Sequence, residues 1–102
     1  MTLRIVPSVG VLPVGKLADV EVWFDQQEGV LDGLKLVGFA VWERRGKQAR
    51  SVTFPARQFS VNGGRRTFAL LRPAETATAG ERLRQRILEA YAEHQEREVT
   101  TQ

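Results

Sequence analysis

The sequence predicts an α+β fold, in which an antiparallel meander sheet of four to five strands carries one C-terminal helix packed on it. Three observations lead to this class. Residues 17–25 alternate apolar and polar side chains like a half-buried strand. Asn62-Gly63-Gly64 is a strong hairpin-turn signal, and residues 78–95 repeat apolar side chains at the helical period. Because no helical segment separates the expected strands, no crossover is needed.

A single domain is expected over residues 1–98, with a frayed tail over residues 99–102. A chain of 102 residues has no room for a second core, and its hydrophobic content of 42% is near the globular norm. It has no cysteine, which excludes disulfides and thiolate metal sites. No signal peptide and no apolar run of membrane-spanning length is recognisable, so a cytoplasmic protein without a membrane partner is expected.

The first expected strands precede residue 44. Residues 3–7 form a short edge strand that ends at Pro7. In residues 17–25 the even positions are apolar, and Trp23 lies on the opposite, polar face. Residues 34–43 are apolar on both faces, which is typical of a central strand or of one covered by a partner subunit. One face would carry Leu34, Leu36, Ala40 and Trp42, and the other Val37, Phe39 and Val41.

The second half of the chain predicts two more strands and the helix. Residues 50–54 alternate until Pro55, and the Asn-Gly-Gly turn then reverses the chain toward residues 66–71. Capping-box spacing at Thr78 and Glu81 marks the helix start. The apolar stripe of the helix comprises Leu83, Ile87, Ala90, Tyr91 and His94.

The residue inventory argues against an enzyme. His94 is the single histidine and lies on the apolar stripe of the helix, which favours a packed side chain over a catalytic base. Asp19, Glu21 and Asp25 alternate along one strand face and are best explained as solvated carboxylates. We therefore expect no catalytic residues, no cofactor, no metal site and no small-molecule substrate.

Positive charge is concentrated in the middle of the chain. Residues 41–72 hold eight of the fifteen Lys and Arg residues and one acid, Glu43, whereas the flanking segments each carry a formal charge of about −2. Seven of these eight bases are arginines, whose planar guanidinium groups bind phosphate and stack on rings. This pattern is typical of a protein that binds nucleic acid.

The candidate nucleic-acid-binding residues lie in two loop clusters and at strand ends: Arg44, Arg45, Lys47, Arg50, Arg57, Arg65 and Arg66. In a meander, alternate hairpin loops meet at one end of the sheet, so the two clusters could line one rim. Trp42 and Phe59 are interleaved with these bases and are candidates for stacking on nucleotide bases. Taken singly, each aromatic residue is better explained by core packing.

The order of elements from about residue 17 to Tyr91 resembles the SpoVG family of small bacterial regulators. The similarity lies in the acidic alternating strand at residues 18–25, in residues 33–37 and 52–57, and in Leu71-Arg72-Pro73 before the closing helix. Ala56, Ala69 and Arg72 depart from the usual family residues. The resemblance implies a homodimer that binds DNA or RNA with limited sequence preference, and it implies Arg57 as a nucleic-acid contact.

Two hypotheses therefore remain. In the first, the chain is a dimeric nucleic-acid-binding regulatory protein whose arginines contact phosphates. In the second, it is a protein-interaction or assembly module without nucleic-acid binding, in which the apolar strand at residues 34–42 docks on a copy or a partner. In that case the arginines are solubilising or pair with acids such as Glu89 and Glu93.

Overall fold

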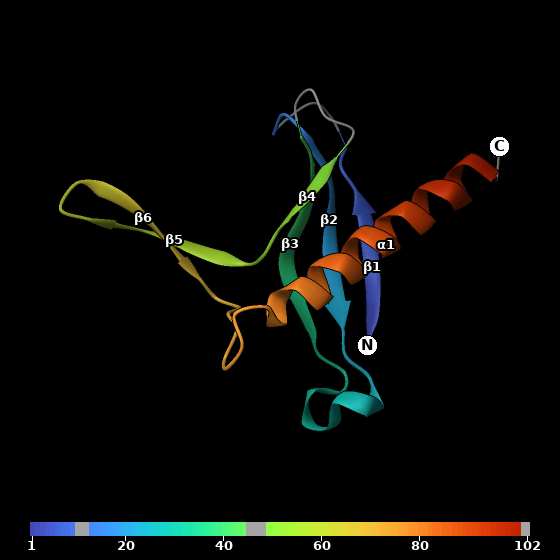
Figure 1. Cartoon of the computed structure of the whole chain (residues 1–102), viewed down its shortest axis with the longest axis horizontal. Helices are drawn as coiled ribbons and strands as arrows, with labels where there is room; N and C mark the ends of the chain where they lie inside the picture. Colours follow the sequence, from blue (N-terminus) through green and yellow to red (C-terminus); the bar gives the residue numbers. More distant parts are fainter. Residues whose placement is uncertain (10–12, 45–48, 101–102) are drawn as a thin grey trace.

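The computed structural model describes residues 1–9, 13–44 and 49–100, and it confirms the α+β class. Six strands, one 3-10 helix and one long helix follow one another along the chain (Figure 1). Their bounds are β1 Thr2–Pro7, β2 Lys16–Trp23, η1 Gln26–Leu31, β3 Lys35–Glu43, β4 Arg50–Thr53, β5 Ala56–Val61, β6 Gly64–Ala69 and α1 Ala79–Thr100.

The first four strands form one antiparallel meander in the order β1-β2-β3-β4. The alternation predicted for β2 is confirmed, since Ala18, Val20 and Val22 are at most 2% exposed while Trp23 remains 39% exposed. A capping box that the sequence analysis did not predict is found around η1. There the Asp25 carboxylate accepts from Gln27 N–H and the Glu28 carboxylate accepts from Asp25 N–H.

A bulge in β3 changes the facing that the sequence predicted for this strand. Val20 pairs with Phe39 but Val22 pairs with Leu36, so β3 holds one extra residue between these pairs. Gly38 lies in the bulge with a φ of 108°, a conformation that favours glycine. Leu36 therefore packs against the same core as Phe39, and the expectation that they face opposite ways is wrong.

Helix α1 covers one face of the four-stranded sheet, where it packs across β1, β3 and β4 (Figure 1). The predicted helical stripe is confirmed, because Ile87 is fully buried and Tyr91 is 6% exposed against the sheet. The buried core comprises Ala18, Val20, Val22, Phe39, Val41, Val52, Ile87 and Tyr91. The opposite face of the sheet is left uncovered in the described part of the chain.

Strands β5 and β6 form a separate two-stranded hairpin that projects away from the sheet (Figure 1). The expectation of one continuous sheet, with residues 66–71 joining it, is therefore wrong. Pro55 has no N–H to extend the ladder of β4, and its ring lies over Gly38, where a β-carbon added at Gly38 would be 3.1 Å from Pro55 Cβ. The chain consequently turns out of the sheet at Pro55 and begins β5.

Candidate nucleic-acid interface

The register of the β5–β6 hairpin determines which side chains share a face. Asn62 and Gly63 have φ angles of 51° and 79°, as a two-residue type I′ turn requires. Arg57 consequently pairs with Phe68, and Phe59 pairs with Arg66. Directly paired residues of an antiparallel ladder point to the same side, so these four side chains form one surface, which we call the Arg/Phe face.

The other face of the hairpin is polar and carries Gln58, Ser60, Arg65 and Thr67. Arg65 is thus separated from its sequence neighbour Arg66, because adjacent strand residues point to opposite sides. Both predicted contacts belong to the hairpin, but a flat ligand on the Arg/Phe face would meet Arg66 and not Arg65.

All residues of β5 and β6 are exposed. Phe59 and Phe68 keep 40% and 44% of their surface accessible, although aromatic rings on a strand usually pack against a core. The two rings therefore present apolar surface to solvent in the middle of a basic hairpin. Core packing, which the sequence analysis favoured for Phe59 taken singly, is therefore wrong for this residue.

The hairpin is electrostatically unbalanced. No Asp or Glu occurs between Glu43 and Glu75. Arg57, Arg65 and Arg66 form no ion pair with a carboxylate of residues 1–9, 13–44 and 49–100. Their charges are therefore available to an external anion.

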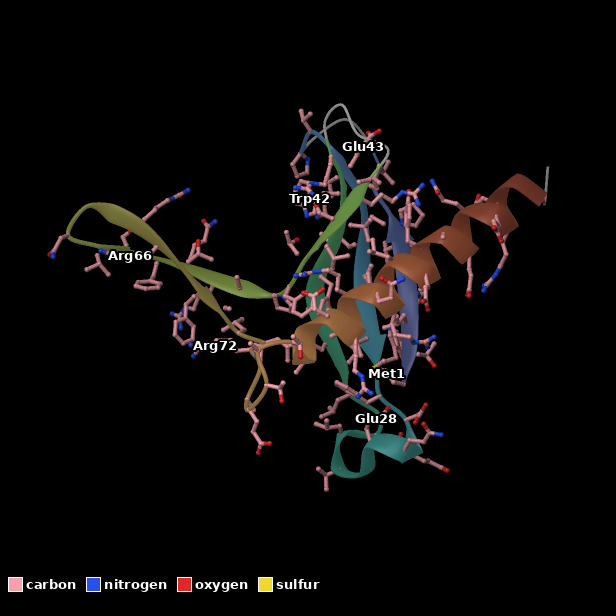
Figure 2. The ribbon with its side chains drawn as sticks, in the orientation of Figure 1. Met1, Glu28, Trp42, Glu43, Arg66 and Arg72 are labelled. Atoms are coloured by element: carbon pink, nitrogen blue, oxygen red, sulfur yellow. The ribbon has the colours of Figure 1, made fainter. Side chains whose placement is uncertain are left out.

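Arg72 extends the Arg/Phe face toward the base of the hairpin. Figure 2 shows Arg72 at the base of the hairpin. Its guanidinium carbon lies 4.2 Å from the centre of the Phe68 ring, in cation–π contact. The sequence analysis included Arg72 in the basic block but not among the contacts, and it overlooked Phe68. The signal was present: a two-residue Asn-Gly loop fixes the pairing, so Phe68 must face Arg57.

The remaining predicted residues lie apart from this face. Arg44 is exposed at the end of β3, and its backbone N–H donates to Ala49 O at 3.1 Å. Arg45 and Lys47 lie outside the described residues. Arg50 points to the helix, where it donates to Gln95 Oε1 at 2.6 Å and lies 4.9 Å from the centre of the Tyr91 ring.

Trp42 is also occupied within the sheet. Its Nε1–H donates to Thr53 Oγ1 at 2.8 Å, on the uncovered face of the sheet. Figure 2 shows Trp42 and Glu43 at one end of the sheet and Arg66 on the projecting hairpin. Among the described residues, Arg44 and the hairpin arginines do not line the common rim that the sequence left possible, because β6 is not part of the four-stranded sheet.

A second cationic and aromatic cluster surrounds Trp23 on the uncovered sheet face. The cationic groups of Arg4 and Lys35 lie 5.6 Å and 5.0 Å from the centre of its ring. Here, however, Glu21 accepts from Trp23 Nε1 at 2.9 Å and pairs with Lys35 at 3.4 Å. The hydrogen bond from Trp23, with the nearby Lys35 and Arg4, lowers the pKa of Glu21. Glu21 therefore offsets one of the two positive charges of this cluster.

Other features of the described residues are weaker candidates for a functional site. A concavity of about 920 Å³ beside the C-terminal half of α1 is lined by Pro7, Tyr91 and His94 among others. His94 Nε2 lies 3.7 Å from Glu98 Oε1, beyond hydrogen-bond distance. Among the described residues, no group of three or more His, Asp or Glu side chains is placed to hold a metal ion. No helix in the described ranges is both long and apolar enough to cross a membrane.

Comparison of the chain with protein-family models, with curated proteins and with solved structures finds no match.

Proposed function

We propose that this protein binds nucleic acid through the β5–β6 hairpin and acts as a small regulatory protein. The observation that carries the proposal is the Arg/Phe face, where Arg57 and Arg66 each lie directly across from an exposed phenylalanine. Together with Arg65 and Arg72, the hairpin and its base carry four positive charges and no carboxylate. The phosphates of a nucleic-acid backbone are the complementary partner.

The shape of the hairpin supports the same partner. A two-stranded ribbon with both faces exposed can lie in the major groove of a duplex or alongside a single strand. Arginine guanidinium groups without carboxylate partners bind phosphate in a forked geometry without first breaking an ion pair. The resemblance to the SpoVG family implies the same class of partner and a homodimer, and Arg57 lies within the segment that carries that resemblance.

A second candidate function is assembly through apolar surface. Leu34 and Val37 at the start of β3 are 57% and 52% exposed, and Val30 in η1 is 96% exposed. A copy of the chain that covers this surface would make the protein an oligomerisation module. This reading leaves the unbalanced charge of the hairpin without a role, so we favour nucleic-acid binding.

The test is the salt dependence of binding to labelled oligonucleotides. We expect affinity to fall steeply between 50 and 200 mM salt, because each phosphate contact releases counterions. The double variant Arg57→Ala/Arg66→Ala should reduce the log–log slope by roughly one to two units. Sedimentation of the same samples reports on oligomerisation, which is compatible with both candidate functions.

A matched control is Arg82→Ala/Arg86→Ala, which removes the same charge from exposed positions on α1. The control should change the slope less than the hairpin variant does. Absence of binding at low salt, or equal effects of the two double variants, would contradict the proposed function.

A further inference from the structure

We infer that the ligand of the Arg/Phe face is a single-stranded nucleic acid whose unpaired bases stack on Phe59 and Phe68. This inference rests on the proposed function and adds the strand state of the ligand. The hairpin register places the two rings on one face and on neighbouring strands, in residue pairs that are separated along the ladder by the Gln58–Thr67 pair. Both rings are open to solvent.

The spacing of the two rings separates a single strand from a duplex. Diagonal neighbours on one face of an antiparallel pair are about 7–8 Å apart. Successive bases in a duplex strand are stacked about 3.4 Å apart and leave no room for a side chain between them. Two rings at the hairpin spacing can each receive a base only when those bases are unstacked, as in a flexible single strand.

The arginines alternate with the rings in the way that such a strand requires. Each phenylalanine is paired across the ladder with an arginine, so a phosphate can meet a guanidinium group beside each stacked base. Arg72, whose guanidinium carbon lies 4.2 Å from the centre of the Phe68 ring, adds a further guanidinium group beside that ring. Phe68 nevertheless keeps 44% of its surface exposed.

The Trp23 cluster is not a second site of this kind. Trp23 is 39% exposed and has two cations over its ring, so aromatic exposure and nearby charge are similar to those of the hairpin. The carboxylate of Glu21 is bound to both Trp23 and Lys35, and a second carboxylate, that of Asp19, is paired with Lys16 on the same face. Arg4, Lys16 and Lys35 against Asp19 and Glu21 leave a net charge of only +1 there, so phosphates are attracted less than by the acid-free hairpin, which makes Trp23 the internal control.

The experiment compares fluorescence anisotropy for one sequence of about 12 nucleotides as single-stranded DNA, as RNA and as duplex DNA, at one fixed low salt concentration. We expect tighter binding to the single strands than to the duplex. The ratio of the DNA and RNA affinities identifies which strand chemistry is preferred.

Two substitutions at each ring separate stacking from apolar contact. Phe59→Leu and Phe68→Leu retain apolar volume but remove the π-face, and each should weaken single-strand binding by about 5- to 150-fold. Phe59→Trp and Phe68→Trp retain a stacking surface and should preserve binding. Trp23→Leu should leave the single-strand affinity unchanged, and none of the Phe59 and Phe68 variants should change duplex affinity more than about twofold.

The outcomes are distinguishable. Equal affinity for single strand and duplex, with Phe→Leu variants that bind normally, overturns this inference and leaves the proposed function intact. No binding to any oligonucleotide at low salt overturns both. If Phe→Leu variants lower the sedimenting mass of the free protein without affecting binding, the rings mediate self-association and the inference is also overturned. Circular dichroism and urea unfolding confirm that each variant folds. If a Leu variant does not fold, single-strand binding by the Trp variants tests the stacking instead.

Discussion

The four-stranded sheet with its helix differs from the β5–β6 hairpin in how far its side chains are buried. In the sheet, the side chains of Val20, Phe39 and Val41 are fully buried under α1, whereas no residue of β5 or β6 is buried. Burial of apolar surface stabilises the first region. An isolated two-stranded hairpin is marginally stable by itself. The comparison teaches that the structural core and the proposed ligand surface of this protein are separate parts of the chain.

The two regions also differ in charge. On the uncovered sheet face, Lys16 pairs with Asp19 and Lys35 pairs with Glu21. In the hairpin, none of the arginines forms an ion pair with a carboxylate of the described residues, and the chain has no acid between Glu43 and Glu75. A paired cation contributes little to attracting a distant phosphate, while an unpaired set raises the local potential. The lysines of the sheet face are therefore engaged in ion pairs within the protein, whereas the hairpin arginines can attract an external phosphate.

The largest expected effect contrasts two phenylalanines. Phe39 is fully buried and its ring centre lies 5.3 Å from that of Phe54, so Phe39→Ala should lower the free energy of unfolding by about 3–5 kcal/mol. Phe59→Ala should lower it by less than about 1 kcal/mol. Urea unfolding measures both, with Phe39→Leu as an intermediate variant. Similar losses at the two positions would show that the hairpin belongs to the core.

The next effect concerns the junction between the two regions. Gly38→Ala combines a φ of 108° with the close approach of Pro55, and should lower the free energy of unfolding by about 2–4 kcal/mol. Gly33→Ala is the matched control, because Gly33 has a φ of 90° and no atom within 4 Å of the added carbon. It should cost about 1–2 kcal/mol. Equal decreases in the free energy of unfolding for the two variants would mean that Pro55 moves to accommodate the added β-carbon without cost.

A smaller effect tests whether the hairpin opens independently of the sheet. Gly63→Ala strains the turn at a φ of 79°, with open space around the added carbon. Hydrogen exchange of the β5 and β6 amides should accelerate roughly 5- to 30-fold, while the urea midpoint of the protein shifts little. Acceleration of the β2 and β3 amides by the same factor would instead show that the two regions unfold as one unit.

The smallest expected effect concerns the cluster around Trp23. The pKa of Glu21 is lowered in the fold, chiefly by the hydrogen bond from Trp23. A carboxyl with a lowered pKa stabilises the fold above its unfolded pKa, and this stabilisation is lost as the pH falls below about 4.5 toward the folded pKa. Trp23→Phe should therefore raise the pKa of Glu21. An NMR titration of its side chain measures the change, with Phe59→Leu as the unaffected control.

Much of the fold was predictable because the signals are local. The alternation along β2, the Asn-Gly turn and the helical stripe ending near His94 each depend on neighbours in sequence. Part of the candidate site was equally accessible, since the turn fixes the pairing of Phe59 with Arg66 and of Phe68 with Arg57. The bulge at Gly38 was not predictable from alternation, because one inserted residue reverses the facing of those before it.

By itself, the sequence determined five of the six strands found in the described residues, the helix and an acid-free segment from Arg44 to Ala74. Only the tertiary structure decided how the bases within that segment are distributed. Pro55 packs over Gly38 and directs β5 away from β4, while Arg50 turns toward Tyr91 and Gln95 on α1. Charge and periodicity are properties of the chain alone, but the packing of residues distant in sequence determines which arginines remain available to a ligand.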